Sequence, residues 1–257
     1  MDNKINVVSL ASGSSGNATY VRCGETEILI DAGISCKRLC ASLGEIGTDI
    51  KNISAVLVTH EHIDHVKGLD VLSRKIGTPV HIVDASCTEY ARKYKCDTSS
   101  FNVHTLGYEL DIGSLHIASF YSPHDSAACV GYRIESESDS FGFATDLGYV
   151  DREAVDHLLG CRKVVLESNY DEKMLLNGPY PPSLKQRIMS EKGHLSNYDC
   201  AALALFLAER GTGSFLLAHL SEENNTPEIA FNVSSRALAG RGVSLNVADR
   251  YSPTYLI

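Results

Sequence analysis

The sequence predicts an α/β protein in which two β-sheets pack together and helices cover their outer faces. Two observations favour this class: strand patterns fall in two clusters along the 257 residues, and helical patterns follow each cluster. A hydrophobic fraction of 44% and a charged fraction of 21% are typical of a globular chain with one sizeable core. Because no Pro/Ser-rich linker or internal repeat divides the chain, we expect one domain over residues 1–257.

The first third of the chain begins with strands around a Gly-Ser turn and continues as alternating strands and helices. The β-branched, apolar run at 53–58 predicts a buried strand, and the amphipathic pattern at 66–75 predicts a helix. The other elements expected here are strands at 5–10, 19–23, 27–30 and 80–83, the turn at 12–17, and a helix at 86–95.

The middle of the chain is rich in strands, and the last third returns to alternating strands and helices. Apolar runs separated by polar turns such as 137–139 predict the strands. The expected strands are at 115–121, 128–135, 140–144, 163–166 and 214–218, and the expected helices are at 197–209 and 228–239.

Net charge and hydropathy exclude several classes of protein. The formal net charge of −9 lowers the expectation of a long nucleic-acid footprint, although bound metal ions can supply positive charge at a local site. The longest apolar run, 200–208, is far shorter than the roughly 20 residues that span a bilayer. Residues 1–4 lead into only a few apolar residues, so we expect no secretory signal, no membrane partner and a cytoplasmic location.

The eight cysteines are scattered and form no Cys-x-x-Cys pair. In a chain without a secretory signal, this pattern favours free, buried thiols over disulfides. Cys36 and Cys40 are four residues apart on an expected helix, but no neighbouring His or Cys completes a ligand set. We therefore expect both thiols to pack in the core.

Four apolar strands each end one to three residues before a residue that can bind a metal ion. These residues are His60, His124, Asp146 and His219. Because the ends of neighbouring strands share one rim of a sheet, the four side chains can converge while the strands stay buried. We expect them to form one site.

The densest group of metal-binding side chains is the segment 59–65, Thr-His-Glu-His-Ile-Asp-His. In an extended turn His60 and His62 point the same way, because side chains alternate with a period of two. Asp64 and His65, at the start of the next helix, point to a second position. This arrangement predicts two neighbouring metal sites, and imidazole and carboxylate without thiolate suit Zn, Mn or Fe.

Nearly the whole chain resembles the metallo-β-lactamase superfamily, whose fold is a four-layer αβ/βα sandwich. His60-x-His62-x-Asp64-His65 resembles the metal signature of that superfamily, and Asp31 resembles the acidic residue that braces the metal loop. The resemblance implies one ion held by His60, His62 and His124. It implies a second held by Asp64, His65 and His219, with Asp146 as the bridge.

Departures from the pattern separate classes within the superfamily. True lactamases have Cys at the bridging position, where this chain has Asp146, and the diiron oxygen reductases have an acid in place of His62. Both classes become disfavoured. Thioesterases of the glyoxalase II type share the ligand set and remain an alternative.

Two segments between Asp146 and His219 are similar to transfer-RNA 3′-processing nucleases. In those enzymes a glutamate orients a histidine near the attacked phosphate, and the matching residues here are Glu167 and His194. A histidine beside a dimetal site suits protonation of a leaving oxygen. In the alternative interpretation His194 is a surface residue and Ser196 only caps the helix that follows.

The Gly-Ser turn at 9–18 and the segment 218–228 narrow the resemblance to the YycJ/WalJ branch, which is associated with 5′ to 3′ DNA exonuclease activity. The turn can donate N–H groups to a phosphate, or its glycines can serve backbone geometry alone. We expect four residues to contact a terminal phosphate or the neighbouring backbone: Ser14, Asn17, Ser196 and Asn224. No inserted cap or basic arm is evident, which suits a site that takes a chain end.

The leading hypothesis is a dimetal phosphodiesterase that acts as a DNA exonuclease. A hydroxide between two divalent ions would attack phosphorus, Asp64 would orient it, and His194 would protonate the leaving oxygen. The alternatives are an RNA-processing nuclease, a thioester or small cyclic-phosphodiester hydrolase, and a metal-stabilised binding module without turnover. A DNA end is the expected partner, RNA is a further possibility, and a homodimer is considered.

Overall fold

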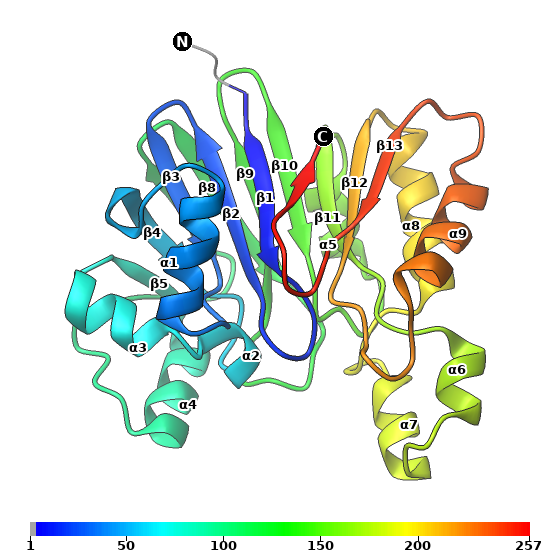
Figure 1. Ribbon diagram of the computed structural model, residues 1–257, viewed down its shortest axis with the longest axis horizontal. Coiled ribbons are helices and arrows are strands. Elements are labelled where there is room, and N and C mark those ends of the chain that lie inside the picture. The colour runs from blue at the N-terminus through cyan, green and yellow to red at the C-terminus, as the bar shows by residue number, and fades with distance from the viewer. Residues whose placement is uncertain (1–3) are drawn as a thin grey trace.

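Two seven-stranded mixed sheets pack face to face in the computed structural model, which describes residues 4–257 (Figure 1). The first sheet has the order β14-β1-β2-β3-β4-β5-β6. Strands β3 to β6 run parallel, and the pairs from β14 to β3 are antiparallel. The strands are β14 (Thr254–Leu256), β1 (Asn6–Ala11), β2 (Ala18–Cys23), β3 (Thr26–Ile30), β4 (Ile53–Leu57), β5 (Val80–Val83) and β6 (Asn102–His104).

The second sheet repeats this plan with the order β13-β12-β11-β10-β9-β8-β7. Strands β10 to β13 are parallel, and β7 to β10 pair antiparallel. The strands are β13 (Ser244–Val247), β12 (Ser214–Ala218), β11 (Lys163–Glu167), β10 (Ser140–Ala144), β9 (Val130–Glu135), β8 (Leu115–Tyr121) and β7 (Glu109–Ile112).

Helices cover the outer face of each sheet and complete four layers (Figure 1). The first sheet carries α1 (Cys36–Glu45), α3 (Leu69–Val71) and α4 (Asp84–Tyr94), and the second carries α5 (Arg152–Leu158), α8 (Asn197–Ala208) and α9 (Pro227–Ala237). The remaining helical segments are α2 (Ile63–Val66), α6 (Glu172–Asn177), α7 (Pro182–Ile188), a 3₁₀ turn at Ile50–Asn52 and a π-helical turn at Leu72–Ile76. Helices α6 and α7 extend beyond the layered body on the side of the second sheet.

Alternation along the parallel strands explains the layers. In β4 and the residue after it, Ala55 and Leu57 face the core between the sheets, whereas Val56 and Val58 face the core beneath the helices. A strand buried on both faces needs such a continuous β-branched and apolar run. The predicted four-layer α/β sandwich is therefore confirmed.

The strands predicted in the first two-thirds of the chain are present within one or two residues, but the prediction of one helix over 66–75 is wrong. The segment is divided at Gly68, whose N–H donates to the carbonyl of Ala32 at 2.7 Å. A Cβ at Gly68 would lie only 2.5 Å from the carbonyl oxygen of Ile34. This close approach of another loop interrupts the helix, which the amphipathic pattern does not reveal.

Edge strands and peripheral helices were also absent from the prediction. Strands β6, β7 and β13 are only three or four residues long and are exposed or half-buried throughout, so each offers at most two apolar residues, too few for their alternation to stand out in the sequence. The domain boundary of 1–257 stays a prediction, and residues 1–3 lie outside the described part of the chain. These three residues make up most of the segment 1–4 from which we expect no secretory signal. No helix within residues 4–257 combines the length and apolarity needed to cross a bilayer.

Within the part of the chain that the structure describes, the eight cysteines form no disulfide, as predicted, but they are not all buried. Cys40 is exposed, so its expected core packing is wrong, whereas Cys36 is half-buried and packs against the core beneath the helices. The buried face of α1 consists of Leu39, Ser42 and Leu43, which places Cys40 on the solvent side. Burial and the neighbouring Cys40 raise the pKa of the Cys36 thiol.

Candidate metal centre

The candidate site lies at one rim of the sandwich, where strands of both sheets end. Strands β3 and β4 are parallel, as are β10, β11 and β12, so the carboxyl ends within each set share an edge. Asp31, His60, Asp146, Glu167 and His219 occupy these ends or lie within three residues of them. The predicted convergence of the strand-end side chains is therefore what the structure shows.

His60, His62 and His124 form a group of three imidazoles whose donor atoms lie within 4.8 Å of one another. The Nδ1 of His124 donates to the carbonyl of Gly193 at 3.0 Å, which leaves its Nε2 as an electron-pair donor. Burial, together with the other histidines, holds the pKa of His60 well below its usual value, and burial lowers the pKa of His62. Neutral imidazoles facing a common point are the donor set that a transition-metal ion requires.

Asp64, His65 and His219 form the second group within the same distance limit. The Oδ2 of Asp64 lies 3.3 Å from Nε2 of His65 and 3.5 Å from Nε2 of His219. Burial lowers the pKa of His219, but Asp146, Asp64 and Glu167 outweigh it and raise that pKa to about 10. Burial raises the pKa of Asp64, but His65 and His219 outweigh it and hold it below its usual range. A divalent ion bound here would replace the protons on these imidazoles.

Asp146 lies between the two groups. One carboxylate oxygen is 3.7 Å from Nε2 of His124, and the other is 3.4 Å from Nε2 of His65. Three buried atoms at the centre have no hydrogen-bond partner within the described chain: Nε2 of His60, Nε2 of His219 and Oδ2 of Asp146. Buried polar atoms without partners are costly, so their convergence fits a site built for metal ions. The residues present therefore fit divalent ions, whose identity and number stay predictions.

Backbone strain is concentrated at the same place. Four non-glycine residues of the described chain have a positive φ, and three of them are Asp31 (63°), Asp146 (55°) and His219 (56°). Left-handed backbone is unfavourable for residues with a Cβ and persists only where the surroundings enforce it. Each of these residues directly follows, or nearly follows, a parallel strand, and the reversal turns its side chain into the site.

Asp31 holds the metal loop, residues 59–65, in place through hydrogen bonds. Its carboxylate is fully buried and accepts hydrogen bonds from Nδ1 of His65 at 2.7 Å, from the Thr59 amide at 2.8 Å and from the Thr59 hydroxyl. These bonds fix which nitrogen of His65 faces the centre. Gly33 lets the same loop approach, because a Cβ there would lie 1.6 Å from the carbonyl oxygen of Asp64.

Glu167 holds two histidines at once. Its Oε1 accepts from Nδ1 of His194 and from Nδ1 of His219, each at 2.8 Å, and its Oε2 accepts the amides of Leu147 and Leu195. Burial raises the pKa of Glu167, but His194, followed by His219, outweighs it and holds the carboxylate ionised. With no exposed surface, Glu167 is a positioning residue rather than a group that touches substrate. The side chain of His194 is 22% exposed at the edge of the centre.

Ser196 and Asn224, which we expect to contact a terminal phosphate or the neighbouring backbone, are both fully buried, so the structure does not bring them to an accessible surface and their substrate role stays a prediction. The Ser196 hydroxyl accepts from the Asp199 amide at 3.1 Å and donates to the Asp199 carboxylate, which is the helix-capping alternative. The side-chain amide of Asn224 donates to the Ser221 hydroxyl at 3.3 Å, and the backbone carbonyl of Asn224 accepts the Asp171 amide, so this residue holds loops together.

Asn17 also departs from its expected role. Its amide nitrogen lies 3.1 Å from Nε2 of His65 and 3.3 Å from Oδ2 of Asp64, while its side-chain oxygen accepts the Gly13 amide. Asn17 therefore connects the Gly-Ser turn to the metal loop instead of facing a ligand. Of the four expected substrate residues, Ser14 alone is exposed.

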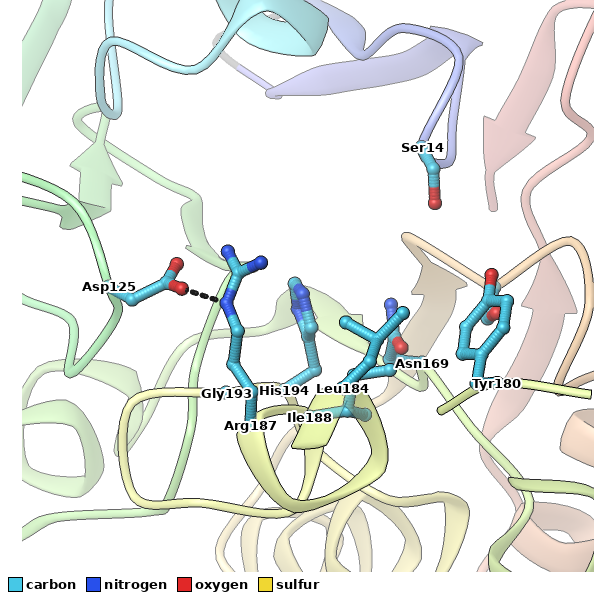
Figure 2. A pocket seen from close by; sticks show the side chains of 10 residues that line it. Ser14, Asp125, Asn169, Tyr180, Leu184, Arg187, Ile188, Gly193 and His194 are labelled. Carbon is cyan, nitrogen blue, oxygen red and sulfur yellow. Dashed lines mark hydrogen bonds and ion pairs between the residues drawn. The ribbon is translucent and has the colours of Figure 1, made fainter. Parts of the chain in front are cut away.

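A pocket adjoins the metal centre at His194, and sequence reasoning missed most of its walls. Ser14 lies on one side, and Asn169 lies across from it near Leu184 and Tyr180; Tyr180, Leu184 and Arg187 come from the hairpin of α6 and α7 (Figure 2). Arg187 pairs through Nε with Asp125, the residue after His124. The only sequence signal for Asp125 is its place beside a ligand, and nothing local marks Arg187.

The chain matches the model of the β-lactamase superfamily domain over residues 26–220, which includes every strand-end ligand described above. It is 36% identical over 247 residues to exodeoxyribonuclease WalJ of Streptococcus pneumoniae serotype 2, covering 93% of this chain and 92% of that protein. It is 35% identical over 240 residues to exodeoxyribonuclease YycJ of Bacillus anthracis, covering 93% and 91%.

Among solved structures, the metallo-β-lactamase fold protein YhfI of Bacillus subtilis superposes with a TM-score of 0.72. The superposition covers 98% of this chain and 99% of that one, at 18% sequence identity. At that identity the likeness concerns the fold alone.

Proposed function

Because the chain belongs to the metallo-β-lactamase superfamily, we propose that it is a metal-dependent phosphodiesterase that removes nucleotides from the 5′ end of DNA. The observation that carries the reaction class is His194, held by buried Glu167 beside two groups of metal-binding side chains. The observation that supports DNA is the identity to two relatives named exodeoxyribonucleases over more than nine-tenths of this chain.

The metal-binding residues of the proposal are the two groups already described, with Asp146 between them. Two divalent ions, of Zn, Mn or Fe, would supply Lewis-acid chemistry that activates water and neutralises phosphate charge. The carboxylate of Asp64, ionised at neutral pH, accepts a hydrogen bond from the attacking water and so orients it. The side chain of Asp64 is 19% exposed, so water can reach its carboxylate.

His194 completes the reaction on the leaving-group side. Because Glu167 takes the Nδ1 hydrogen, the imidazole is held in one orientation and Nε2 remains for the leaving oxygen. A proton passes from Nε2 to that oxygen as its bond to phosphorus breaks. The buried Glu167 carboxylate accepts from Nδ1 of His194 at 2.8 Å and so keeps the ring oriented for this role.

The test is digestion of end-labelled linear DNA, linear RNA and covalently closed circular DNA, with Mn²⁺ or Zn²⁺ returned to metal-stripped protein. We expect mononucleotides from the 5′ end of linear DNA, resistance of closed circles, and no activity without metal. His62→Ala, which lacks one ligand, is the negative control. Cleavage of circles would contradict an exonuclease, and hydrolysis of thioesters without any nuclease activity would favour the glyoxalase-like alternative.

Salt dependence tests the proposed grip on a DNA end. A net charge of −9 disfavours contact with a long stretch of phosphates, so we expect affinity to fall only gently as salt rises. A steep slope, typical of six or more neutralised phosphates, would contradict the end-binding mode. The cytoplasmic location, the homodimer and any action on RNA stay predictions.

A further inference from the structure

The pocket beside His194 is small and has one apolar wall. Its volume is about 170 Å³, below the range of roughly 300–1,000 Å³ that is usual for sites of whole small ligands. Leu184 and Ile188 lie four residues apart on one face of α7, and Tyr180 precedes that helix. In Figure 2 these three side chains stand on the same side of the space, and Ser14 lies across from them.

The opposite end of the pocket carries a cation with unused donors. Arg187 bonds to Asp125 through Nε alone, and no residue in 4–257 accepts a hydrogen bond from its two terminal nitrogens. Figure 2 shows these nitrogens pointing away from Asp125 into the open space. The side chain of Arg187 is 61% exposed, so solvent or a ligand can reach the guanidinium group.

Asp125 connects this cation to the metal centre. Its Oδ1 lies 3.3 Å from Nε2 of His124, while its Oδ2 accepts from Arg187. The guanidinium group is thereby held beside a residue of the three-imidazole group. Arg187 is the one Arg or Lys side chain among the residues that line this pocket, and a planar guanidinium with two free nitrogens matches a phosphate.

Resting on the proposed nuclease function, we propose that this pocket binds the unpaired terminal nucleotide of a single-stranded or frayed DNA end. The base lies on Tyr180 against Leu184 and Ile188, and Arg187 binds the attacked phosphate. One nucleobase fits the pocket volume of about 170 Å³, whereas a base pair does not. A blunt duplex must therefore open its last pair before cleavage, and a single-stranded end need not.

The chemistry assigns the terminal nucleotide to the His194 side. Water adds its oxygen to phosphorus and releases one proton to solvent, the bond from phosphorus to the 3′ oxygen of the terminal nucleotide breaks, and His194 protonates that oxygen and later regains a proton from solvent. The products are a nucleotide with a free 3′ hydroxyl, which leaves the pocket, and a DNA strand with a new 5′ phosphate. Because His194 lines the pocket, its proton reaches the nucleotide seated there.

The first experiment places the fluorescent base 2-aminopurine at the 5′ end of a single-stranded oligonucleotide whose first linkage resists hydrolysis. With the metal-loaded protein, we expect stacking on Tyr180 to quench the fluorescence. Tyr180→Phe should keep the quenching and Tyr180→Ala should lose it. Tyr255→Ala, which removes an exposed tyrosine on β14, is the matched control and should quench like the wild type. Equal quenching by Tyr180→Ala and wild type would overturn the proposal.

The second experiment measures turnover. We expect Tyr180→Ala to raise KM for single-stranded DNA roughly 10- to 100-fold, the usual effect of removing a base-stacking aromatic. The same variant should hydrolyse methyl p-nitrophenyl phosphate, which has no base, at the wild-type rate. Arg187→Ala should lower kcat on both substrates, while Arg152→Ala, a change at an exposed arginine on α5, should alter neither.

The two substrates separate failure of this inference from failure of the proposed function. If the wild-type protein cleaves DNA, and Tyr180→Ala and Arg187→Ala each cleave it as well as the wild type does, the pocket proposal alone is wrong. If the wild-type protein cleaves neither substrate in the presence of metal, the nuclease function is wrong. A blunt duplex cleaved as fast as a single-stranded end would also contradict the requirement for an unpaired nucleotide.

Discussion

Histidines gather at two places in this molecule, and carboxylates accompany them at only one. At the metal centre, His65 and His219 are within 3.5 Å of Asp64. At the edge of the first sheet, His81 on β5 and His104 on β6 face each other, with Nδ1 of His81 2.9 Å from Nε2 of His104. Their rings stack at 5.2 Å, and no acidic residue forms an ion pair with either among residues 4–257.

The two clusters differ in the direction of their pKa shifts. Carboxylates overcome burial at His219 and raise its pKa to about 10. At His81 burial and the neighbouring His104 act together and lower the pKa to about 4. A pair of histidines without carboxylates therefore stays neutral, and its two rings form a hydrogen bond with each other. Where buried carboxylates lie beside the imidazoles, the carboxylates supply the negative charge that attracts a divalent cation.

The largest expected effect comes from making the metal centre more like the edge cluster. Asp146→Asn removes the carboxylate between the two groups, so we expect the content of divalent metal to fall and turnover to drop about 10³-fold or more. Elemental analysis and nuclease assays measure both. His81→Asn is the matched control and should keep full metal content. Unchanged metal and activity in Asp146→Asn would contradict the assigned role.

The next effect concerns the histidine that faces the pocket. His194→Ala should retain its metal and lose about 10² to 10⁴ in turnover on DNA, because the leaving oxygen is no longer protonated. The loss should be smaller on a nitrophenyl phosphodiester, whose leaving group needs no proton. Kinetics on the two substrates provide the measurement, and an equal loss on both would assign His194 to binding or structure.

Removal of the metal should destabilise the protein through its buried carboxylates and imidazoles. Ions that bind the folded state alone add stability, so chelation should lower the melting temperature by about 5 to 15 °C. Calorimetry before and after addition of a chelator measures the shift, and returning Mn²⁺ or Zn²⁺ should reverse it. A melting temperature that changes neither on chelation nor on return of the metal would argue against a bound ion.

The smallest effect is a pH dependence at the edge cluster. Above pH 6.5 His81 is neutral in both the folded and the unfolded protein, so its titration does not change the free energy of unfolding. Below pH 6.5 His81 binds a proton in the unfolded chain, whereas in the folded protein, where its pKa is about 4, it stays neutral. Stability is therefore lost as pH falls from 6.5 towards 4. Between pH 7 and pH 5 the free energy of unfolding of His81→Asn should fall by about 1 kcal/mol less than that of the wild type, after allowance for solvent screening.

Urea denaturation of metal-free wild type and His81→Asn at both pH values measures that difference. The lost bond to His104 affects the variant at both pH values and cancels in the comparison. An identical loss of stability in the two proteins would show that His81 does not carry the pH dependence.

Much of the fold and of the metal-binding set could be predicted from the sequence because those features are local. A buried parallel strand requires a continuous apolar run, such as the one before His60, and its end is marked by the first polar residues. The spacing of His60, His62, Asp64 and His65 sets their directions over a few residues. Parallel pairing then carries Asp146 and His219 to the same rim as a consequence of topology.

Only the tertiary structure decided which polar side chains are free to meet a ligand. Asn17 has the residue type of a phosphate site, but the metal loop, 47 residues further along the chain, occupies its side-chain amide. Arg187 and Asp125 are 62 residues apart and pair because the α6–α7 hairpin projects beside the metal centre. No local pattern encodes such a pair, since its geometry depends on how distant segments pack.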